Sequence, residues 1–157
     1  MKAVLISIQP KWVEKIASGN KTIEVRKTKP KLERPFKCYI YCTNWKDNTY
    51  WKNRYKDKLG KVVGEFVCRG MMDGGSHLLP KQSCLTIDEI FDYAKGKRVY
   101  GWRIADLKIY DKPKELGEFK TCNKCKYGKI ENKTCFDCDG YKIARPPQSW
   151  CYVEEKE

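Results

Sequence analysis

The chain has 157 residues, of which 41% are hydrophobic and 13% aromatic, and its 33 lysines and arginines against 20 aspartates and glutamates give a net charge of +13. Single domains commonly contain roughly 100–200 residues, so we expect one domain, residues 1–157, with enough apolar residues for a core. The longest apolar runs are too short for a membrane span or a secretory signal, which excludes both classes and favours a cytoplasmic protein.

The first 26 residues predict a strand, a helix and a second strand. Ala3–Ile8 is an apolar run of strand length. Pro10 suits a first helical position, and Lys11–Ser18 carries its apolar residues on one face before Gly19 ends the helix. An extended segment then continues to Arg26.

The rest of the chain predicts further strands and one more helix. Thr86 and Glu89 form the pattern of a capping box, so a helix is expected over Ile87–Tyr93. Residues that favour β-structure are concentrated in four runs, Phe36–Thr43, Lys61–Cys68, Arg98–Ile109 and Ser149–Val153. Short strands and helices without regular alternation predict an α+β fold, a small mixed β-barrel with flanking helices.

The basic residues are concentrated at the beginning of the chain. Residues 1–60 carry +10 of the total charge of +13. A one-sided basic surface attracts polyanions through its long-range field and through counterion release, so nucleic acid is the first partner to consider. The alternative is an ordinary lysine-rich surface in water.

The extended segment at residues 18–26 places charged side chains on alternate positions. Side chains alternate between the two faces of a strand, so Thr22, Glu24 and Arg26 are expected on one face and Lys21 on the other. Glu24 and Arg26 then form an ion pair at a cleft or meet a polar ligand. The alternative is an amphipathic strand whose polar face lies in water.

The pattern Gly19-x-Lys21-x-x-Glu24-x-Arg26, with Ser7-Ile8-Gln9-Pro10 before it and Val63-Gly64-Glu65 and Trp102-Arg103-Ile104 after it, resembles an ASCH domain of the PUA-like superfamily. The resemblance covers residues 1 to about 115 and the strand at 149–153. It implies a small β-barrel with a cleft beside the first helix, and a function in binding RNA or a nucleotide-like ligand. Some members of this family are enzymes.

The resemblance also implies which residues meet the ligand. Lys21 and Arg26 would contact phosphate, and Glu24 would accept from a base amine or orient Arg26. Trp102, beside Arg103, would supply a stacking surface, although a tryptophan in a strand is also typical of a core. The predicted binding residues in this cleft are Ser7, Gln9, Lys21, Glu24, Arg26, Trp102 and Arg103.

A hydrolase in the same cleft is the alternative function. Small ASCH proteins similar to this chain are amidohydrolases that act on acylated cytidine with a lysine, a threonine and a glutamate. The lysine matches Lys21, but Glu24 stands in the threonine position and the glutamate position falls near Ser83. Other members resemble ribonucleases, for which Lys21 and Glu24 would be the catalytic residues.

Residues 44–58 interleave tryptophans and tyrosines with basic residues. Aromatic rings beside cations can hold a single strand, so Lys52 and Arg54 are further predicted contacts for nucleic acid. A short helix in which Trp51 and Tyr55 pack inward explains the pattern equally well.

Two Cys-x-x-Cys pairs near the C-terminus predict a metal site. Four thiolates leave no open position, so structural zinc is expected, with iron or disulfides as alternatives. Some 30 residues cannot build a core alone, and we therefore interpret residues 117–146 as a zinc-knuckle insertion, which could also dock a protein partner. The predicted ligands are Cys122, Cys125, Cys135 and Cys138.

Elemental analysis of protein purified without chelator should therefore return about one zinc per chain, as a single site of four thiolates requires. Replacing Cys135 with serine should release the metal and leave the rest of the domain folded. A metal-free protein whose four thiols react freely with a thiol reagent would contradict this prediction.

Overall fold

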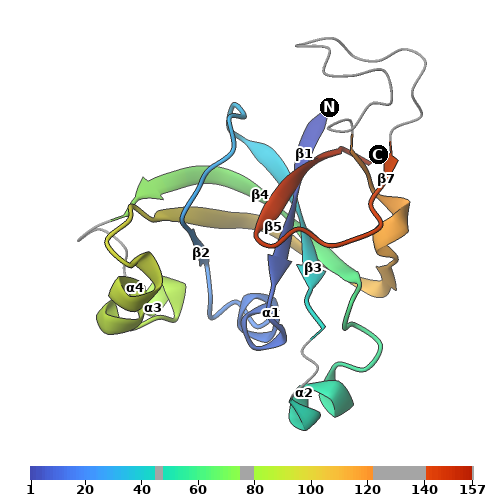
Figure 1. Cartoon of the computed structure of the whole chain (residues 1–157), viewed down its shortest axis with the longest axis horizontal. Coiled ribbons are helices and arrows are strands. Elements are labelled where there is room, and N and C mark those ends of the chain that lie inside the picture. Colours follow the sequence, from blue (N-terminus) through green and yellow to red (C-terminus); the bar gives the residue numbers. More distant parts are fainter. Residues whose placement is uncertain (45–47, 75–79, 122–140, 157) are drawn as a thin grey trace.

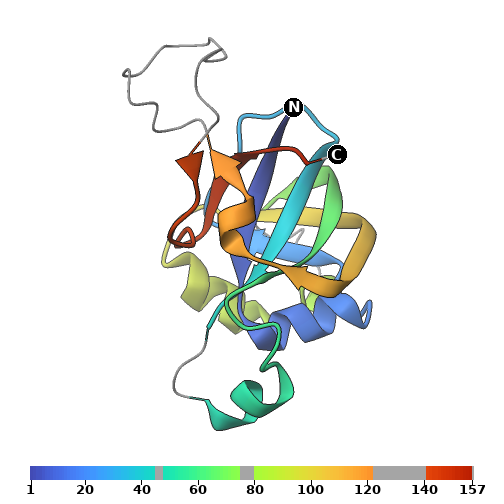
Figure 2. The same ribbon diagram turned by 90° about the vertical axis from the view of Figure 1, so that its right-hand side faces the viewer.

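The computed structural model of the chain describes residues 1–44, 48–74, 80–121 and 141–156. Its largest element is one six-stranded sheet with the strand order β2-β5-β4-β3-β1-β8. The sheet curls into a half-barrel, with helices at one end (Figures 1 and 2). The strands of this sheet are β1 (Lys2–Ile8), β2 (Ile23–Arg26), β3 (Phe36–Cys42), β4 (Val62–Asp73), β5 (Tyr100–Lys114) and β8 (Trp150–Glu154).

The strand pairing makes β1 an interior strand between β3 and β8. β1 runs parallel to β3 and antiparallel to β8, and all the other neighbouring strands are antiparallel. Because both faces of β1 are covered, Ala3, Val4, Leu5 and Ile6 have no exposed surface. β6 (Lys120–Thr121) and β7 (Tyr141–Lys142) form a separate two-stranded sheet.

Four α-helices and one 3₁₀ helix are present in the described part of the chain. Pro10 opens α1, and Val13 and Ile16 bury its inner face. The capping box predicted for α4 is present, because Glu89 N donates to Thr86 Oγ1 at 3.1 Å and Thr86 N donates to Glu89 Oε2 at 2.8 Å. The helices are α1 (Pro10–Ala17), α2 (Thr49–Arg54), α3 (Pro80–Ser83), α4 (Ile87–Ala94) and the 3₁₀ helix at Leu116–Glu118.

The predicted elements are confirmed, with two differences in the sheet. β4 continues to Asp73 and β5 to Lys114, several residues beyond the predicted ends, because the two strands pair with each other along most of their length. In the described residues the sheet is open, with β2 and β8 at its edges, instead of a closed barrel.

The helical interpretation of residues 44–58 holds for its described part. The rings of Trp51 and Tyr55 pack edge to face with their centroids 5.4 Å apart, and Tyr55 is buried. Both contact the core cluster on one face of the sheet. Tyr50 is exposed.

Gly64 permits the close approach of β4 and β5. A Cβ atom added there would lie 2.6 Å from the carbonyl oxygen of Lys108, which is backbone and cannot move aside easily. Gly64→Ala should therefore lower the free energy of unfolding by about 1–3 kcal/mol, measured by urea denaturation. Gly117→Ala is the matched control, because a Cβ atom there would meet nothing within 4 Å. Equal stability of the two variants would contradict this prediction.

Candidate functional site

A pocket of about 410 Å³ opens between α1, β2 and the turn before α4. Its walls come from segments far apart in the sequence, because the curled sheet brings the ends of β1 and β2 and the segment before β8 together. The residues that line it are Ser7, Ile8, Gln9, Trp12, Lys21, Glu24, Val25, Arg26, Thr43, Leu85, Tyr93 and Gln148.

Arg26 joins three segments at the base of this pocket. Its Nη2 donates to the carbonyl oxygen of Ser7 at 2.6 Å and lies 2.9 Å from Glu24 Oε1. Its Nη1 donates to Ser149 Oγ at 3.3 Å, just before β8 begins. The guanidinium therefore bridges β2, β1 and the entrance to β8, although it is only 8% exposed.

Lys21 and Glu24 complete a buried ionic network. Lys21 Nζ donates to the carbonyl oxygen of Ser83 at 2.5 Å and lies 3.4 Å from Glu24 Oε2. It also lies 5.0 Å from the centroid of the Trp12 ring. Lys21 is 2% exposed and Glu24 6%. Each carboxylate oxygen of Glu24 thus faces a different cation.

This network corrects two expectations for the segment. The polar face of β2 is buried, so the interpretation of an amphipathic strand in water is wrong. Lys21 does not point away from Glu24, because it precedes the strand, which begins only at Ile23, and strand alternation does not apply to it.

The pocket carries a net positive charge. Lys21 and Arg26 against Glu24 leave one positive charge in excess, and the other lining residues are uncharged. Electrostatic interactions are stronger away from bulk water, so an anionic group would be attracted into this pocket.

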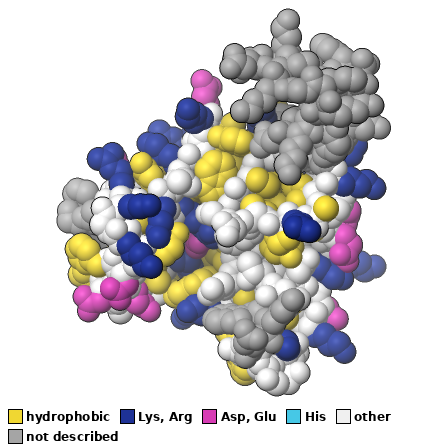
Figure 3. Space-filling view, viewed as in Figure 1, with side chains coloured by type: hydrophobic (Ala, Val, Ile, Leu, Met, Phe, Trp, Pro, Cys, Tyr) yellow, Lys and Arg dark blue, Asp and Glu magenta, His cyan; other side chains and the backbone are white. Residues whose placement is uncertain are grey.

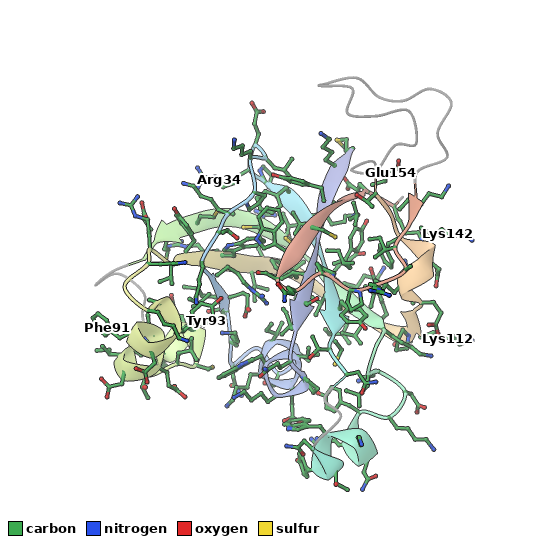
Figure 4. All side chains as sticks on the ribbon, in the orientation of Figure 1. Arg34, Phe91, Tyr93, Lys112, Lys142 and Glu154 are labelled. Carbon is green, nitrogen blue, oxygen red and sulfur yellow. The ribbon has the colours of Figure 1, made fainter. Side chains whose placement is uncertain are left out.

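Two aromatic side chains stand at the walls of the pocket. Trp12 comes from α1 and Tyr93 from α4, and Tyr93 is 38% exposed. Burial raises the pKa of the Tyr93 hydroxyl; the nearby Arg26 lowers it and Glu24 raises it. The hydroxyl therefore stays protonated at neutral pH and can donate. Figure 4 shows Tyr93 and Phe91 on the same helix.

The structure brings together five of the residues that the sequence predicts for ligand binding. Ser7, Gln9, Lys21, Glu24 and Arg26 all line the pocket. Ser7 Oγ donates to the carbonyl oxygen of Pro147 at 2.7 Å, and neither Ser7 nor Gln9 makes a side-chain cap for α1.

The other predicted binding residues lie elsewhere. Trp102 has no exposed surface and packs edge to face against Phe36 and Trp150, so it belongs to the core and cannot stack on a base. Arg103 follows it in β5, exposed and outside the pocket lining. Lys52 and Arg54 are on α2 and do not line the pocket either, and Arg54 is paired with Glu14.

Sequence reasoning missed seven of the residues that line the pocket, of which four have aromatic or polar side chains. Trp12 was expected only on the apolar face of the first helix, and Tyr93 only at the end of the second. Thr43 and Gln148 follow and precede strands without any distinctive pattern. The one sequence signal that could have indicated an aromatic wall is Trp12, because it lies shortly before the Gly19-x-Lys21-x-x-Glu24-x-Arg26 pattern.

The four cysteines predicted to bind zinc lie outside the described residues. Within the part of the chain that the structure describes, no group of three or more His, Cys, Asp or Glu side chains is placed to hold a metal. Burial raises the pKa of the thiols of Cys38, Cys42, Cys68 and Cys151, which agrees with small apolar side chains in strands.

The family model of the ASCH domain matches residues 6–143. This match covers most of the chain, and the protein belongs to the ASCH domain family. The family is generally one of RNA-binding-type domains. None of the curated proteins matches the chain. No helix in the described residues is long and apolar enough to cross a membrane.

Solved structures of an ASCH protein from Zymomonas mobilis have a similar fold. The structure of that protein superposes with a TM-score of 0.64 at 19% identity, over 98% of this chain and 88% of the other. Its Tyr-to-Phe mutant gives a TM-score of 0.65 at 19% identity, over 99% and 92% of the two chains. Its Ser-to-Ala mutant gives 0.63 at 19% identity, over 98% and 89%. At this identity the likeness establishes the fold alone.

The buried network predicts a large effect of neutralising Glu24. Glu24→Gln should lower the free energy of unfolding by about 3–5 kcal/mol, because Lys21 and Arg26 would remain buried without an anion. Thermal or urea unfolding measures this change.

Glu14→Gln is the matched control for this measurement. It removes the carboxylate from the exposed pair with Arg54, and such pairs contribute little to stability. If the two variants lost the same stability, the network around Glu24 would not be a buried one in solution.

Proposed function

We propose that this ASCH domain binds RNA through one nucleotide unit seated in the pocket of Lys21, Glu24 and Arg26. The observation that carries this proposal is a buried ionic network, positive by one charge, at the base of a pocket with aromatic walls. A nucleotide has a charged phosphate and a flat apolar base, and these two features match the pocket.

Arg26 is the main candidate for the phosphate contact. A guanidinium presents a planar set of donors that suits phosphate oxygens, and it keeps its charge at any physiological pH. Its Nε is buried and has no acceptor among the described residues, so the protein leaves one donor of the guanidinium unsatisfied. Glu24 holds the guanidinium in place through Nη2, which lies 2.9 Å from Glu24 Oε1.

Trp12 and Tyr93 supply flat surfaces for the base. Single-strand-binding proteins hold bases on aromatic rings at about 1–3 kcal/mol per base, largely without regard to sequence. The amides of Gln9 and Gln148 also line the pocket, and each has both a donor and an acceptor for a base edge. The volume of about 410 Å³ lies in the range of small-ligand sites, roughly 300–1,000 Å³, and is suited to one nucleotide.

A hydrolase is the second candidate because Lys21 and Glu24 reach the same pocket. RNA cleavage needs no protein nucleophile when the 2′-hydroxyl of RNA attacks, so two acid–base groups and Arg26 would suffice. The bonding of Lys21 favours a binding role instead. Its Nζ is engaged within the protein by Ser83 O, Glu24 and the Trp12 ring, so it serves to hold the network together.

The amidohydrolase alternative has less support. Glu24 is paired with two cations. Near the position where the resemblance calls for a glutamate carboxylate, Ser83 offers Lys21 only its backbone carbonyl oxygen.

For the C-terminal insertion we keep structural zinc, held by Cys122, Cys125, Cys135 and Cys138, as a proposal. It rests on the spacing of the cysteines alone.

The binding proposal is tested by titrating the protein with single-stranded RNA, nucleoside monophosphates and unphosphorylated nucleosides. RNA should bind, and each monophosphate should bind more tightly than its nucleoside because of the excess charge in the pocket. RNA recovered intact supports a binding protein. RNA cleaved by the parent protein but not by Lys21→Ala would replace the binding role with the hydrolase.

Tyr93→Ala should weaken RNA binding by roughly 5- to 150-fold, the loss of one stacked base at about 1–3 kcal/mol. Fluorescence anisotropy with labelled RNA measures the change. Phe91→Ala is the matched control, because Phe91 is on the same helix and 71% exposed but does not line the pocket. Equal effects of the two substitutions would remove Tyr93 from the binding site.

A further inference from the structure

A second, smaller pocket of about 230 Å³ lies beyond the end of β2. Its walls come from the segment that follows β2, from the far end of β4 and from the first residue of β5. The residues that line it are Lys29, Pro30, Leu32, Arg34, Met71, Asp73 and Tyr100.

The irregular segment 27–34 connects this second pocket to the first. It leaves β2 directly after Arg26, and Lys27 Nζ lies 4.8 Å from the ring centroid of Tyr93, a wall of the first pocket. Two residues later, Lys29 Nζ lies 5.0 Å from the ring centroid of Tyr100, a wall of the second pocket. Each pocket thus has a tyrosine with a lysine over its ring.

The segment is fixed onto the sheet beneath it. Trp150 Nε1 donates to Thr28 Oγ1 at 2.9 Å, and Lys31 N donates to the hydroxyl oxygen of Tyr152 at 2.8 Å. Pro30 is buried and Leu32 packs against the core. The cations of the segment are therefore presented from a fixed backbone, which limits the entropy lost on binding.

The segment is basic, because Lys27, Lys29, Lys31 and Arg34 stand against one acidic residue, Glu33. Lys27, Lys29 and Arg34 make no ion pair with the described residues, whereas Asp73 in the second pocket is paired with Arg98 at 3.5 Å. Two residues of extended chain span at most about 7 Å, so Lys27 and Lys29 lie close enough to meet neighbouring phosphates of one strand.

The charged side chains around the first pocket favour one direction in which a polyanionic ligand can leave it. α4 carries Asp88, Glu89 and Asp92, all exposed, on one side of the pocket. Figure 3 shows acidic side chains at the lower left, over the position of α4, and basic side chains above them toward the centre. A polyanion leaving the first pocket is repelled by α4 and attracted toward the segment 27–34.

We infer that the ligand is a single-stranded RNA that continues from the first pocket along Lys27 and Lys29 into the second, where the next base meets Tyr100 and Arg34 meets phosphate. This inference rests on the proposed function and extends it from one nucleotide to an oligonucleotide. The strand must be single, because a base between protein aromatic rings cannot also stack within a duplex.

The test compares an RNA hexanucleotide with a nucleoside monophosphate, using the full chain and the double variant Lys29→Gln, Arg34→Gln. The variant should bind the hexanucleotide roughly tenfold more weakly. The slope of log K against log[salt] should become about 1.4 less steep, because two phosphate contacts, each contributing about 0.7 to the slope, are lost. Its affinity for the monophosphate, which occupies only the first pocket, should stay within about twofold of the parent.

Lys108→Gln, Lys112→Gln is the matched control, with the same change in charge at two exposed positions of β5 outside both pockets. Figure 4 shows Lys112 on the opposite side of the molecule from Arg34. Equal loss of hexanucleotide binding in both double variants would reduce the effect to net charge and overturn the inference. So would an equal loss for the monophosphate, or no loss at all.

The outcomes also separate this inference from the proposed function. If the parent binds the hexanucleotide and the monophosphate and Lys29→Gln, Arg34→Gln changes neither, the second pocket is not a subsite and the first remains one. If the parent binds neither probe, both ideas are overturned.

Discussion

The side chain of Arg26 is the link on which both the sheet and the pocket depend. It ties the edge strand β2 to β1 through Ser7 O and to the entrance of the other edge strand, β8, through Ser149. No backbone pairing joins the edge strands β2 and β8 in the described residues. Side chains therefore hold the two edges of the half-barrel together along this seam. Burying charges costs several kcal/mol per ion, and well-packed apolar residues could hold such a seam without that cost. Stability alone therefore does not account for three charged groups here, whereas the proposed binding of an anionic ligand would.

Most of the fold follows from local patterns in the sequence. The apolar run of β1, Pro10 at the start of α1 and the capping box at Thr86 each specify an element through interactions within a few residues, and all three are found. The ends of β4 and β5 were not predictable in the same way. Met71 to Asp73 are extended because β5 pairs with them, and that pairing depends on contacts between residues roughly 27 to 31 positions apart.

The candidate site was predictable in part, for a related reason. The two-residue period correctly placed Glu24 and Arg26 on one face, but the period cannot say what covers that face. The covering groups are Ser83, Tyr93 and Ser149, which come from distant segments. Trp102 shows the same limit: it pairs opposite Glu24, so its ring lies on the same face of the sheet, yet Phe36 and Trp150 enclose it completely. It is part of the core instead of a surface for a ligand.

The distribution of charge around the first pocket is more informative than the total of +13. A uniformly basic surface would attract RNA without orienting it, since counterion release depends little on where the cations lie. Here the cations of α2 are partly offset by Glu14, and α4 presents three carboxylates beside the pocket. The segment following β2 also brings cations to the pocket: Lys27 Nζ lies 4.8 Å from the ring centroid of Tyr93 and makes no ion pair with the described residues. Because Lys21, Glu24 and Arg26 stand in or just before the strand that leads into this segment, the short stretch from Lys21 to Arg34 supplies the charged groups of the first pocket and two basic residues of the second.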